Sequence, residues 1–341
     1  MQDEVSMPRT WQAWTWTGHA DPLALALQTV AAAPLQSGQV LVRNAVIGLN
    51  PVDWKVLGGD LVDWQPGKVP GVDGTGEVVA IGSCVPHEWL GERVAYHTSL
   101  ASPGSFAEYT PVDARALLTI PSAVDFDTAA SVPCPALTAW LALDKLPPRR
   151  EPRILISGAG GAVGLYAVQL AAMQGFEVSV MCHPRHWDRL RALGARECFE
   201  GPLDADSEWP QTQASRFFAI VDAVDATHAA RLSPALAANG HLIGIQGRVE
   251  GWPSPPFGRT MSLHEVALGA MHQHGSDADW TRLVDAGNRI LQLIADGRIK
   301  SEPLLTASFD ALPKRLDALR HRSVSGKSVV AVSSFRHAVG L

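Results

Sequence analysis

The segment Arg153-Ile-Leu-Ile-Ser-Gly158-Ala-Gly160-Gly161-Ala-Val-Gly164-Leu-Tyr-Ala-Val-Gln-Leu170 joins an apolar run, a glycine-rich turn and an apolar helical pattern. Glycines at such a turn let the backbone approach a pyrophosphate, and the following helix N-terminus presents unpaired N–H groups. The spacing Gly158-x-x-Gly161-x-x-Gly164 departs from a strict G-x-G-x-x-G, and a purely structural turn is the alternative. The strand–turn–helix context predicts a dinucleotide-binding Rossmann half, in which the binding residues are Gly158, Gly160, Gly161, Ala162, Val163 and Gly164.

The residues after the next apolar run, 178–181, bear on which dinucleotide is favoured. NAD-binding proteins usually place an acid there, about 20 residues after the glycines, to bind the ribose 2′-hydroxyl. This chain reads Cys182-His183-Pro184-Arg185-His186, and its first acid is Asp188. An arginine can instead pair with a 2′-phosphate, a contact worth about 1.5–3 kcal/mol. We therefore predict NADPH, bound in part by His183 and Arg185; the alternative is that Arg185 is a solvated surface residue.

The pattern of hydrophobic residues along the chain changes near residue 125. Upstream, short β-branched segments separated by Gly and Pro predict a barrel or sandwich, with strands at 39–46, 76–81 and 93–96. Downstream, apolar runs alternate with helical patterns, which is typical of a buried parallel sheet. The expected strands are 154–157, 178–181, 217–221, 241–245 and 263–271; the expected helices are 163–173, 187–193, 229–238 and 280–296. Residues 328–332 read as a final strand.

The composition limits the function classes. The chain has 341 residues, a formal net charge of −6 and 46% hydrophobic residues, which suits two folded domains, or one large barrel, and excludes intrinsic disorder. The acidic balance without a basic run argues against nucleic-acid binding. We see no apolar stretch long enough to span a membrane and no signal peptide. The four scattered cysteines indicate reduced thiols and a cytoplasmic location rather than a disulfide framework.

Further segments carry a resemblance to a known family. They are Ile47-Gly-Leu-Asn50-Pro51-Val-Asp53-Trp-Lys55, Pro70-Gly71-Val-Asp73-Gly-Thr-Gly76, Gly91-Glu-Arg93-Val-Ala95, Gly104-Ser-Phe106-Ala-Glu108-Tyr109, Ala136-Leu-Thr138-Ala-Trp140 and Gly326-Lys327. Together with the glycine turn, and in this order, they resemble the medium-chain dehydrogenase/reductase superfamily. Within it the chain is similar to the zinc-independent quinone oxidoreductase and enoyl reductase branch.

The resemblance implies an α/β Rossmann domain, a doubly wound parallel sheet, plus a β-rich GroES-like domain. It implies a GroES-like domain formed by residues 1–126 and 302–341 and a Rossmann domain at 127–301. It also implies an active-site cleft between the two and a homodimer joined at the edges of the Rossmann sheets.

The zinc ligands of the zinc-dependent members of the superfamily can be looked for in this chain. Those members carry a Cys ligand where this chain has Asn50–Asp53 and a Gly-His-Glu where it has Gly71-Val72-Asp73, and the loop of four closely spaced cysteines is missing. Tetrahedral zinc needs such nitrogen and sulfur ligands. His272 and His274 would share a face only on a strand, and nothing else supports them as ligands. We therefore predict no metal.

The expected chemistry follows from the missing Lewis acid. Quinones and α,β-unsaturated carbonyls are the easier acceptors because their conjugation delocalises the developing negative charge, so we predict hydride transfer from NADPH to a small molecule of this kind. An enoyl-thioester reductase is the alternative enzyme, although Trp54 stands where some of these reductases carry a proton-donating tyrosine. A non-catalytic NADPH-binding protein is the alternative outside catalysis.

The family correspondence supplies the remaining candidate residues. Asn50, Asp53 and Lys55 are the expected catalytic residues beside the nicotinamide ribose, with Lys55 binding ribose hydroxyls or polarising the acceptor; a turn at Asn50 with a solvated Lys55 is the alternative. Thr138 is expected near the nicotinamide, and capping or packing of a helix is the alternative. Lys327 is expected near the cofactor, and a solvated lysine in a turn is the alternative. Gln246 and Gly247 are expected to bind the cofactor because they follow the fifth strand, where such sheets bind ligands. Tyr96 and Phe106 are more typical of core residues than of a cleft.

Overall fold

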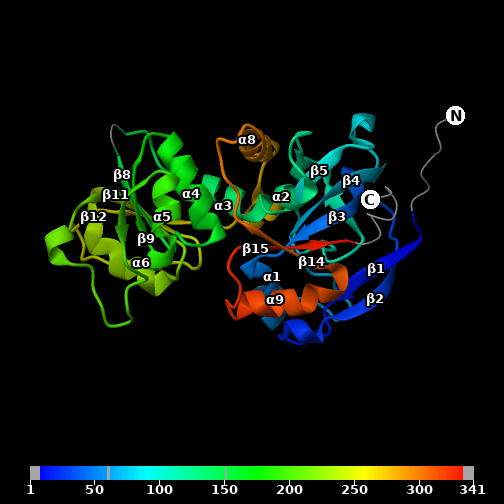
Figure 1. The fold of residues 1–341 in the computed structure, drawn as a ribbon, viewed down its shortest axis with the longest axis horizontal. Helices are drawn as coiled ribbons and strands as arrows, with labels where there is room; N and C mark the ends of the chain where they lie inside the picture. The colour runs from blue at the N-terminus through cyan, green and yellow to red at the C-terminus, as the bar shows by residue number, and fades with distance from the viewer. Residues whose placement is uncertain (1–7, 60–61, 150–151, 333–341) are drawn as a thin grey trace. The chain divides into compact units, whose positions relative to one another are not determined.

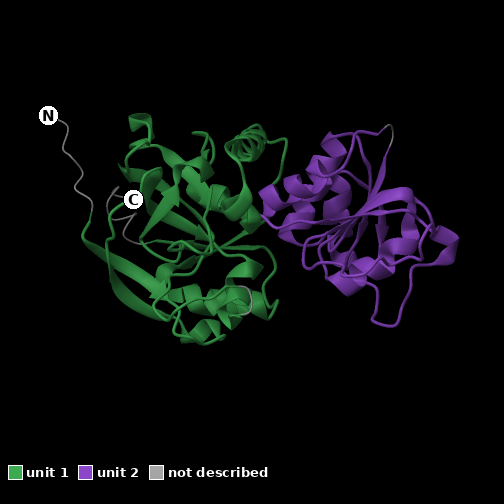
Figure 2. Ribbon diagram, turned by 180° about the vertical axis from the view of Figure 1, so that it is seen from behind, with its two compact units in different colours: residues 1–134, 269–341 green, residues 135–268 purple. Residues whose placement is uncertain are grey.

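The computed structural model describes residues 8–59, 62–149 and 152–332. The chain divides into two compact units (Figure 2). Unit 1 comprises residues 1–134 and 269–341, and unit 2 comprises residues 135–268. Each unit has its own sheet, so each is described by itself.

Unit 2 is built on a six-stranded sheet whose paired strands all run parallel. The strands, in spatial order, are β10 (Ala195–Phe199), β9 (Glu177–Met181), β8 (Arg153–Ser157), β11 (Phe217–Asp222), β12 (Leu236–Gly244) and β13 (Ser262–Glu265). Its helices are α3 (Pro133–Asp144), whose first two residues belong to unit 1, α4 (Ala162–Met173), α5 (Trp187–Ala192) and α6 (Ala226–Leu232). Numbered from β8, the order is 3-2-1-4-5-6, that of a dinucleotide-binding doubly wound sheet. The predicted Rossmann fold is confirmed.

Three elements of this sheet differ from the sequence expectation. β10 was not predicted, because an edge strand that reads Ala-Arg-Glu-Cys-Phe has no continuous apolar run. The helix expected at 229–238 ends at Leu232, because Pro234 lies in a 3₁₀ turn, Ser233–Ala235, that leads directly into β12. The strand expected at 263–271 stops at Glu265, and Gly269–His274 forms helix α7 instead.

Unit 1 contains a seven-stranded sheet with the order β14-β15-β3-β4-β5-β7, in which β6 also pairs with β3. Its strands are β3 (Gln39–Gly48), β4 (Asp73–Ile81), β5 (Arg93–His97), β6 (Tyr109–Asp113), β7 (Leu117–Thr119), β14 (Leu304–Ser308) and β15 (Lys327–Ala331). A separate hairpin pairs β1 (Thr10–Thr15) with β2 (Ala26–Ala31). The helices are α1 (Pro51–Lys55), α2 (Phe126–Ala130), α7, α8 (Asp277–Ala295) and α9 (Leu312–Arg320). The predicted β-rich first domain is confirmed.

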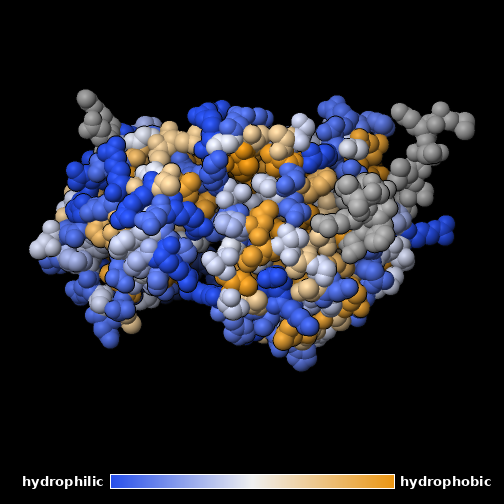
Figure 3. Space-filling model, in the orientation of Figure 1, coloured by the Kyte–Doolittle hydropathy of each residue, from blue (hydrophilic) through white to orange (hydrophobic). Residues whose placement is uncertain are grey.

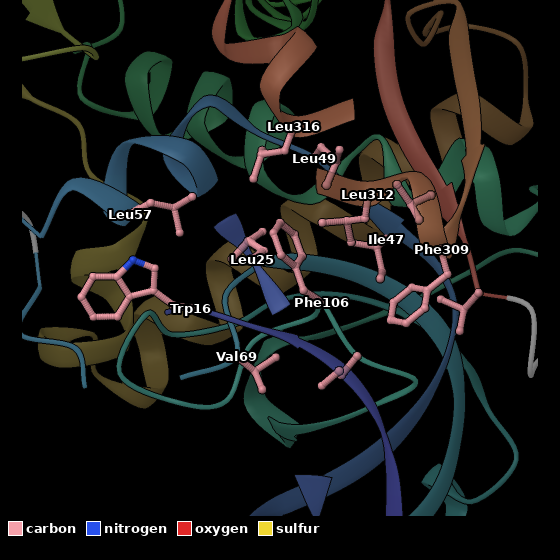
Figure 4. Packing of buried hydrophobic residues seen from close by; sticks show 14 of the residues in the cluster. Trp16, Leu25, Ile47, Leu49, Leu57, Val69, Phe106, Phe309, Leu312 and Leu316 are labelled. Carbon is pink, nitrogen blue, oxygen red and sulfur yellow. The ribbon is translucent and has the colours of Figure 1, made fainter. Parts of the chain in front are cut away.

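The C-terminal segment completes this unit. β15 pairs antiparallel with β3, so strands from opposite ends of the chain lie side by side (Figure 1). α9 turns its buried Leu312 and Leu316 into the same apolar cluster as Ile47 and Phe106 (Figure 4). Because α9 also contacts α1, the helix that carries Asp53 and Lys55 is supported by residues far away in sequence.

The compact units place one segment otherwise than the predicted domain bounds, which stay a prediction. Residues 269–301 group with unit 1, whereas the resemblance assigned them to the Rossmann domain. Helix α8 accounts for the difference, because it contacts β7. The Asp277 carboxylate on α8 pairs with Arg115 at 2.9 Å, and the Asn288 side chain accepts from the Thr119 N–H at 2.9 Å.

The surface facing the viewer in Figure 3 mixes hydrophilic and hydrophobic residues on both units. Within the described ranges, none of the helices has the length and apolar character needed to cross a bilayer.

Candidate functional site

The glycine turn of unit 2 has the geometry of a phosphate-binding loop. β8 ends at Ser157, Gly158 adopts a left-handed φ of +69°, and Gly161 is the N-cap of α4. No side chain caps the first turn of α4, so its backbone N–H groups are left for another acceptor. The turn therefore fits an anionic ligand such as a pyrophosphate.

Two glycines of the turn hold space that a side chain would fill. A Cβ at Gly164 would lie 2.4 Å from Ala159 Cα, so only glycine lets α4 lie so close to the turn. A Cβ at Gly160 would lie 2.5 Å from the Cδ2 atom of His186. This is the close packing that the dinucleotide-binding pattern requires of its glycines.

The segment after β9 folds over the turn and brings basic side chains to it. Of the predicted residues, His183 accepts from the Arg185 N–H at 3.1 Å, and the exposed Arg185 donates its Nε–H to His186 at 3.1 Å. Arg189 donates to the Gly160 carbonyl at 3.1 Å. Burial and the charges of Arg189 and Arg185 lower the pKa of His186, so its ring stays neutral and can accept from Arg185.

His186 and Arg189 were missed as site residues by the sequence analysis. The signal that was available is spacing, because Arg185, in the 3₁₀ turn Pro184–His186, and Arg189, in α5, are four residues apart. Asp188, the first acid after β9, has a fully exposed side chain and pairs with Arg191 at 3.3 Å. No acid of this segment faces the turn in the way an NAD-binding acid would.

The other predicted cofactor residues of unit 2 lie at separate places. Gln246 and Gly247 follow β12 at the carboxyl edge of the sheet, where doubly wound sheets bind ligands. Thr138 lies inside α3 and is buried.

A buried polar network at the same edge was also missed. His228 donates from Nδ1 to Asp222 at 2.6 Å and accepts from the Leu203 N–H at Nε2 at 3.1 Å. Ser157 Oγ is 3.5 Å from the same Nδ1. A hydrolytic triad needs a histidine nitrogen free to take the serine proton, and Nδ1 is already used for Asp222. The network therefore fixes the ends of β8 and β11 beside the turn.

In unit 1 the structure brings together residues that are far apart in sequence. Asn50 is the N-cap of α1, and its backbone N–H donates to Asp53 Oδ2 at 2.7 Å. Its side-chain amide donates to Asp73 Oδ2 at 2.8 Å and accepts from Lys327 Nζ at 2.5 Å. All four side chains are buried, and we call Asn50, Asp53, Asp73 and Lys327 the Asp53 cluster. The sequence analysis singled out three of these residues but missed Asp73 as a partner.

The cluster changes the acidity of its carboxyl groups. Burial raises the pKa of Asp53 to about 8, and the negative charge of Asp73 acts in the same direction. Hydrogen bonds from the Asn50 and Val72 backbone N–H groups and the positive charge of Lys327 act against this rise. Burial also raises the pKa of Asp73, to about 6; Lys327 and the N–H donors of Cys134 and Asn50 act in the opposite direction. Asp73 accepts its two hydrogen bonds at 2.8 and 2.9 Å.

Lys55, the remaining predicted catalytic residue, lies outside the cluster. It is partly buried at the end of α1, with its Nζ 5.8 Å from the centre of the Trp54 ring. Burial, followed by the positive charge of Arg322, lowers the pKa of Lys55. A lysine of this kind gives up its proton more easily than one in water, which suits a hydrogen-bonding role.

The residues at the family's zinc positions have other partners. Val72 is an apolar core residue, and Asn50, Asp53 and Asp73 are bound to one another. Across residues 8–59, 62–149 and 152–332 there is no group of three His, Cys, Asp or Glu side chains that could hold a metal ion. The absence of a metal from the site stays a prediction.

The remaining histidine and aromatic candidates pack in unit 1. His272 stacks on His97 with 3.0 Å between ring nitrogens, whereas His274 is exposed. Tyr96 and Phe106 are fully buried, and the Tyr96 hydroxyl donates to Asn44 at 2.7 Å. Both are core residues, as the sequence favoured.

Comparisons with known proteins agree with this geometry. Residues 36–122 match the alcohol dehydrogenase GroES-like domain. The chain is 30% identical over 309 residues to the chloroplast envelope quinone oxidoreductase homolog of Arabidopsis thaliana, covering 86% of this chain and 90% of that protein. It is 28% identical over 345 residues to the trans-enoyl reductase ccsC of Aspergillus clavatus, covering 91% and 93%.

Among solved structures, the quinone oxidoreductase from Coxiella burnetii has a TM-score of 0.79 at 20% identity, over 95% of this chain and 99% of that chain. The Rossmann sheet, the GroES-like domain and these relatives agree with one another. The chain is therefore an oxidoreductase that belongs to the medium-chain dehydrogenase/reductase superfamily, in its zinc-independent quinone oxidoreductase and enoyl reductase branch.

Proposed function

We propose that this protein is an NADPH-dependent oxidoreductase that transfers hydride to a quinone or an α,β-unsaturated carbonyl without zinc. The observation that carries the proposal is the glycine turn between β8 and α4, with Arg185 and Arg189 on the segment that folds over it. NADPH, when bound, supplies the hydride. The chain's own residues hold the pyrophosphate on the N–H groups of α4 and present arginine to the 2′-phosphate.

The choice of acceptor rests on the donor set of unit 1. Asn50, Asp53 and Val72 stand where zinc-dependent relatives supply ligands, so an unactivated ketone would lose the Lewis acid that polarises its oxygen. A conjugated acceptor needs less help, because the charge that develops on hydride transfer spreads over the enolate or hydroquinone. In this proposal Lys55 donates a hydrogen bond to the acceptor oxygen or the ribose, and solvent supplies the final proton.

The second candidate is an enoyl-thioester reductase. The similarity to a trans-enoyl reductase over 91% of the chain favours it, whereas Trp54 in place of a proton-donating tyrosine speaks against it. A non-catalytic NADPH-binding protein is the alternative outside catalysis. A homodimeric state and a cytoplasmic location stay predictions.

Following NADPH absorbance with three acceptors tests the function. We expect oxidation of NADPH with a quinone and with a simple enone, and slower oxidation with crotonyl-CoA, because the first two need no thioester recognition. A chelator in the buffer should leave the rates unchanged. Crotonyl-CoA as the fastest acceptor would favour the second candidate, and cofactor binding without oxidation of any of the three would contradict the enzyme.

Arg185→Ala tests the cofactor. Removing a charge-assisted contact worth about 1.5–3 kcal/mol should raise the Kd for NADPH by about 10- to 150-fold and hardly change that for NADH. The measurement is a fluorescence titration with both cofactors. Arg191→Ala is the matched control, since Arg191 lies on the same segment but pairs with Asp188. Equal losses for NADPH and NADH in Arg185→Ala would contradict a 2′-phosphate contact.

A further inference from the structure

The Asp53 cluster contains more acid than it can neutralise. Asp53 and Asp73 are 0% exposed and Lys327 is 4% exposed, so two carboxyl groups and one ammonium group share a site away from water. With both carboxyl groups ionised the cluster would carry a net charge of −1. An uncompensated charge in such a place is strongly unfavourable, and a buried acid relieves it by taking up a proton.

The hydrogen bonds of Asp53 and Asp73 leave one oxygen atom of each acid available to carry that proton. Donors reach Oδ2 of each acid: the Asn50 backbone N–H for Asp53, and the Asn50 side chain and Cys134 N–H for Asp73. Within the part of the chain that the structure describes, the buried Oδ1 atoms of both acids have no hydrogen-bond partner. A proton on one of them removes the excess charge, and a neutral carboxyl group costs less to bury than a carboxylate.

We propose that Asp53 and Asp73 share a single proton at neutral pH, and that this proton holds the N-terminus of α1 against β4 and β15. Asp53 lies on α1, Asp73 begins β4 and Lys327 begins β15, and Asn50 bonds to all three. The two acids are thus positioning residues for α1, which ends at Lys55. Only the kinetic consequence for Lys55 rests on the proposed function; the proton itself does not.

The contacts indicate which acid carries the proton. Asp73 accepts from the Asn50 side chain and the Cys134 N–H, and the positive charge of Lys327 is the largest of the effects that favour its ionised form. Backbone N–H groups of Asn50 and Val72 favour the ionised form of Asp53, but the negative charge of Asp73 opposes it. Asp73 is therefore the carboxylate of the pair, and Asp53 carries the proton. The raised pKa of Asp53, about 8, against about 6 for Asp73, both due first to burial, has the same order.

Few charged groups act on the two carboxyl groups of the Asp53 cluster. Asp73 and Lys327 are the charges that act on Asp53. On β5, His97 lies opposite Asp73 in register, and burial keeps its pKa well below the ordinary value, so it is neutral. On β5 as well, burial and then the charge of Asp73 raise the pKa of Tyr96, so its hydroxyl is neutral. The remaining titratable groups on α1, β4, the elements packed against them and the adjoining turns are Arg43, Lys55, Glu77, His87, Glu88, Arg93, Asp125, Asp127, Lys314, Arg315, Asp317, Arg320 and Arg322.

Loss of the proton has a mechanical consequence. Two carboxylates would then lie on the same asparagine with a single ammonium group to balance them. Their repulsion pushes Asp53, and α1 with it, away from Asp73. Lys55 lies two residues beyond Asp53, so the position of its ammonium group depends on the protonation of the pair.

Infrared difference spectroscopy of the full chain tests the shared proton without any need for activity. The wild type should show a protonated-carboxyl C=O band at pH 7, about half of it remaining at pH 8 and about one tenth at pH 9. Asp53→Asn removes the band. Asp73→Asn should remove it as well, because Lys327 then balances Asp53 alone and Asp53 ionises. Asp285→Asn, which changes an exposed acid on α8, should keep it.

The pH dependence of thermal stability is a second measure of the proton on Asp53. The folded-state pKa of Asp53, about 8, lies above its ordinary value of 3.8, so the folded state holds more protons between these values. Stability from this group is complete below about pH 4 and falls as the pH rises towards 8. Thermal melts should show this decline in the wild type and in Asp285→Asn, and a flatter profile in Asp53→Asn.

The outcomes decide between one proton, none and two separate sites. A wild type without the band at pH 7, whether the site is ionised or a cation balances it, overturns the proposal. A band that survives in Asp73→Asn shows that Asp53 is protonated independently and also overturns sharing.

The positioning of Lys55 is tested by the reductase rate once the band behaves as expected. A rate that falls in the wild type as the pH rises through about 8, and does not fall in Asp53→Asn, supports the positioning of Lys55. A pH profile of the rate that is the same in Asp53→Asn as in the wild type overturns it. Lack of activity with every acceptor contradicts the proposed function while the spectra still decide the proton.

Discussion

Gly164→Ala is expected to separate α4 from the phosphate-binding turn and to abolish tight dinucleotide binding. The added Cβ would lie 2.4 Å from Ala159 Cα and 2.7 Å from both its carbonyl carbon and oxygen. These atoms are backbone and cannot rotate away, and residues 164–171 of α4 are buried, so the helix has no free space to shift into. Overpacking of this kind costs about 1–3 kcal/mol in stability.

The effect on binding should exceed the effect on stability. Moving the N-terminus of α4 takes its N–H groups away from the pyrophosphate, and a loss of at least about tenfold in affinity corresponds to about 1.4 kcal/mol. Fluorescence titration with NADPH and urea denaturation measure the two quantities. Gly251→Ala is the control, because no atom lies within 4 Å of the Cβ built there. Unchanged NADPH affinity in Gly164→Ala would contradict a dinucleotide at this turn.

Lys327→Met is expected to be the most destabilising change in unit 1. It removes the only ammonium group that bonds to Asn50 among the described residues and leaves two buried carboxyl groups without a cation. Breaking a buried charge pair by removing one partner costs about 3–5 kcal/mol, because the remaining charge is left uncompensated. The free energy of unfolding, measured by urea denaturation, should fall by that amount.

The pH dependence separates this mechanism from a simple packing defect. Without Lys327 both acids must be protonated to remain buried, so the loss should be smaller at pH 5 than at pH 8. Lys314→Met, which removes an exposed lysine of α9, should change stability by less than about 0.5 kcal/mol. A loss in Lys327→Met that is the same at pH 5 and pH 8 would show that charge is not the cause.

Strands, turns and helices whose defining residues are contiguous could be predicted from the sequence. The run from Arg153 through the glycines to α4 is contiguous, so strand, turn and helix are visible together, and the apolar strands β8, β9 and β11 needed no partner to be identified. The order of motifs likewise predicted the family. β10 escaped because an edge strand with charged residues has no apolar signature.

Contacts across the chain could not be read from the sequence. Arg189 reaches Gly160 over 29 positions, Asn50 reaches Asp73 over 23, and Lys327 reaches Asn50 over 277. A lysine, an asparagine and two aspartates in a sequence read as ordinary polar residues, and their burial is known only when β15 and α1 are packed together. The local pattern of residues thus determined the fold and the cofactor-binding turn. The tertiary structure alone decided which charges share a buried site, because burial and distance, not residue type, set the energy of a charge.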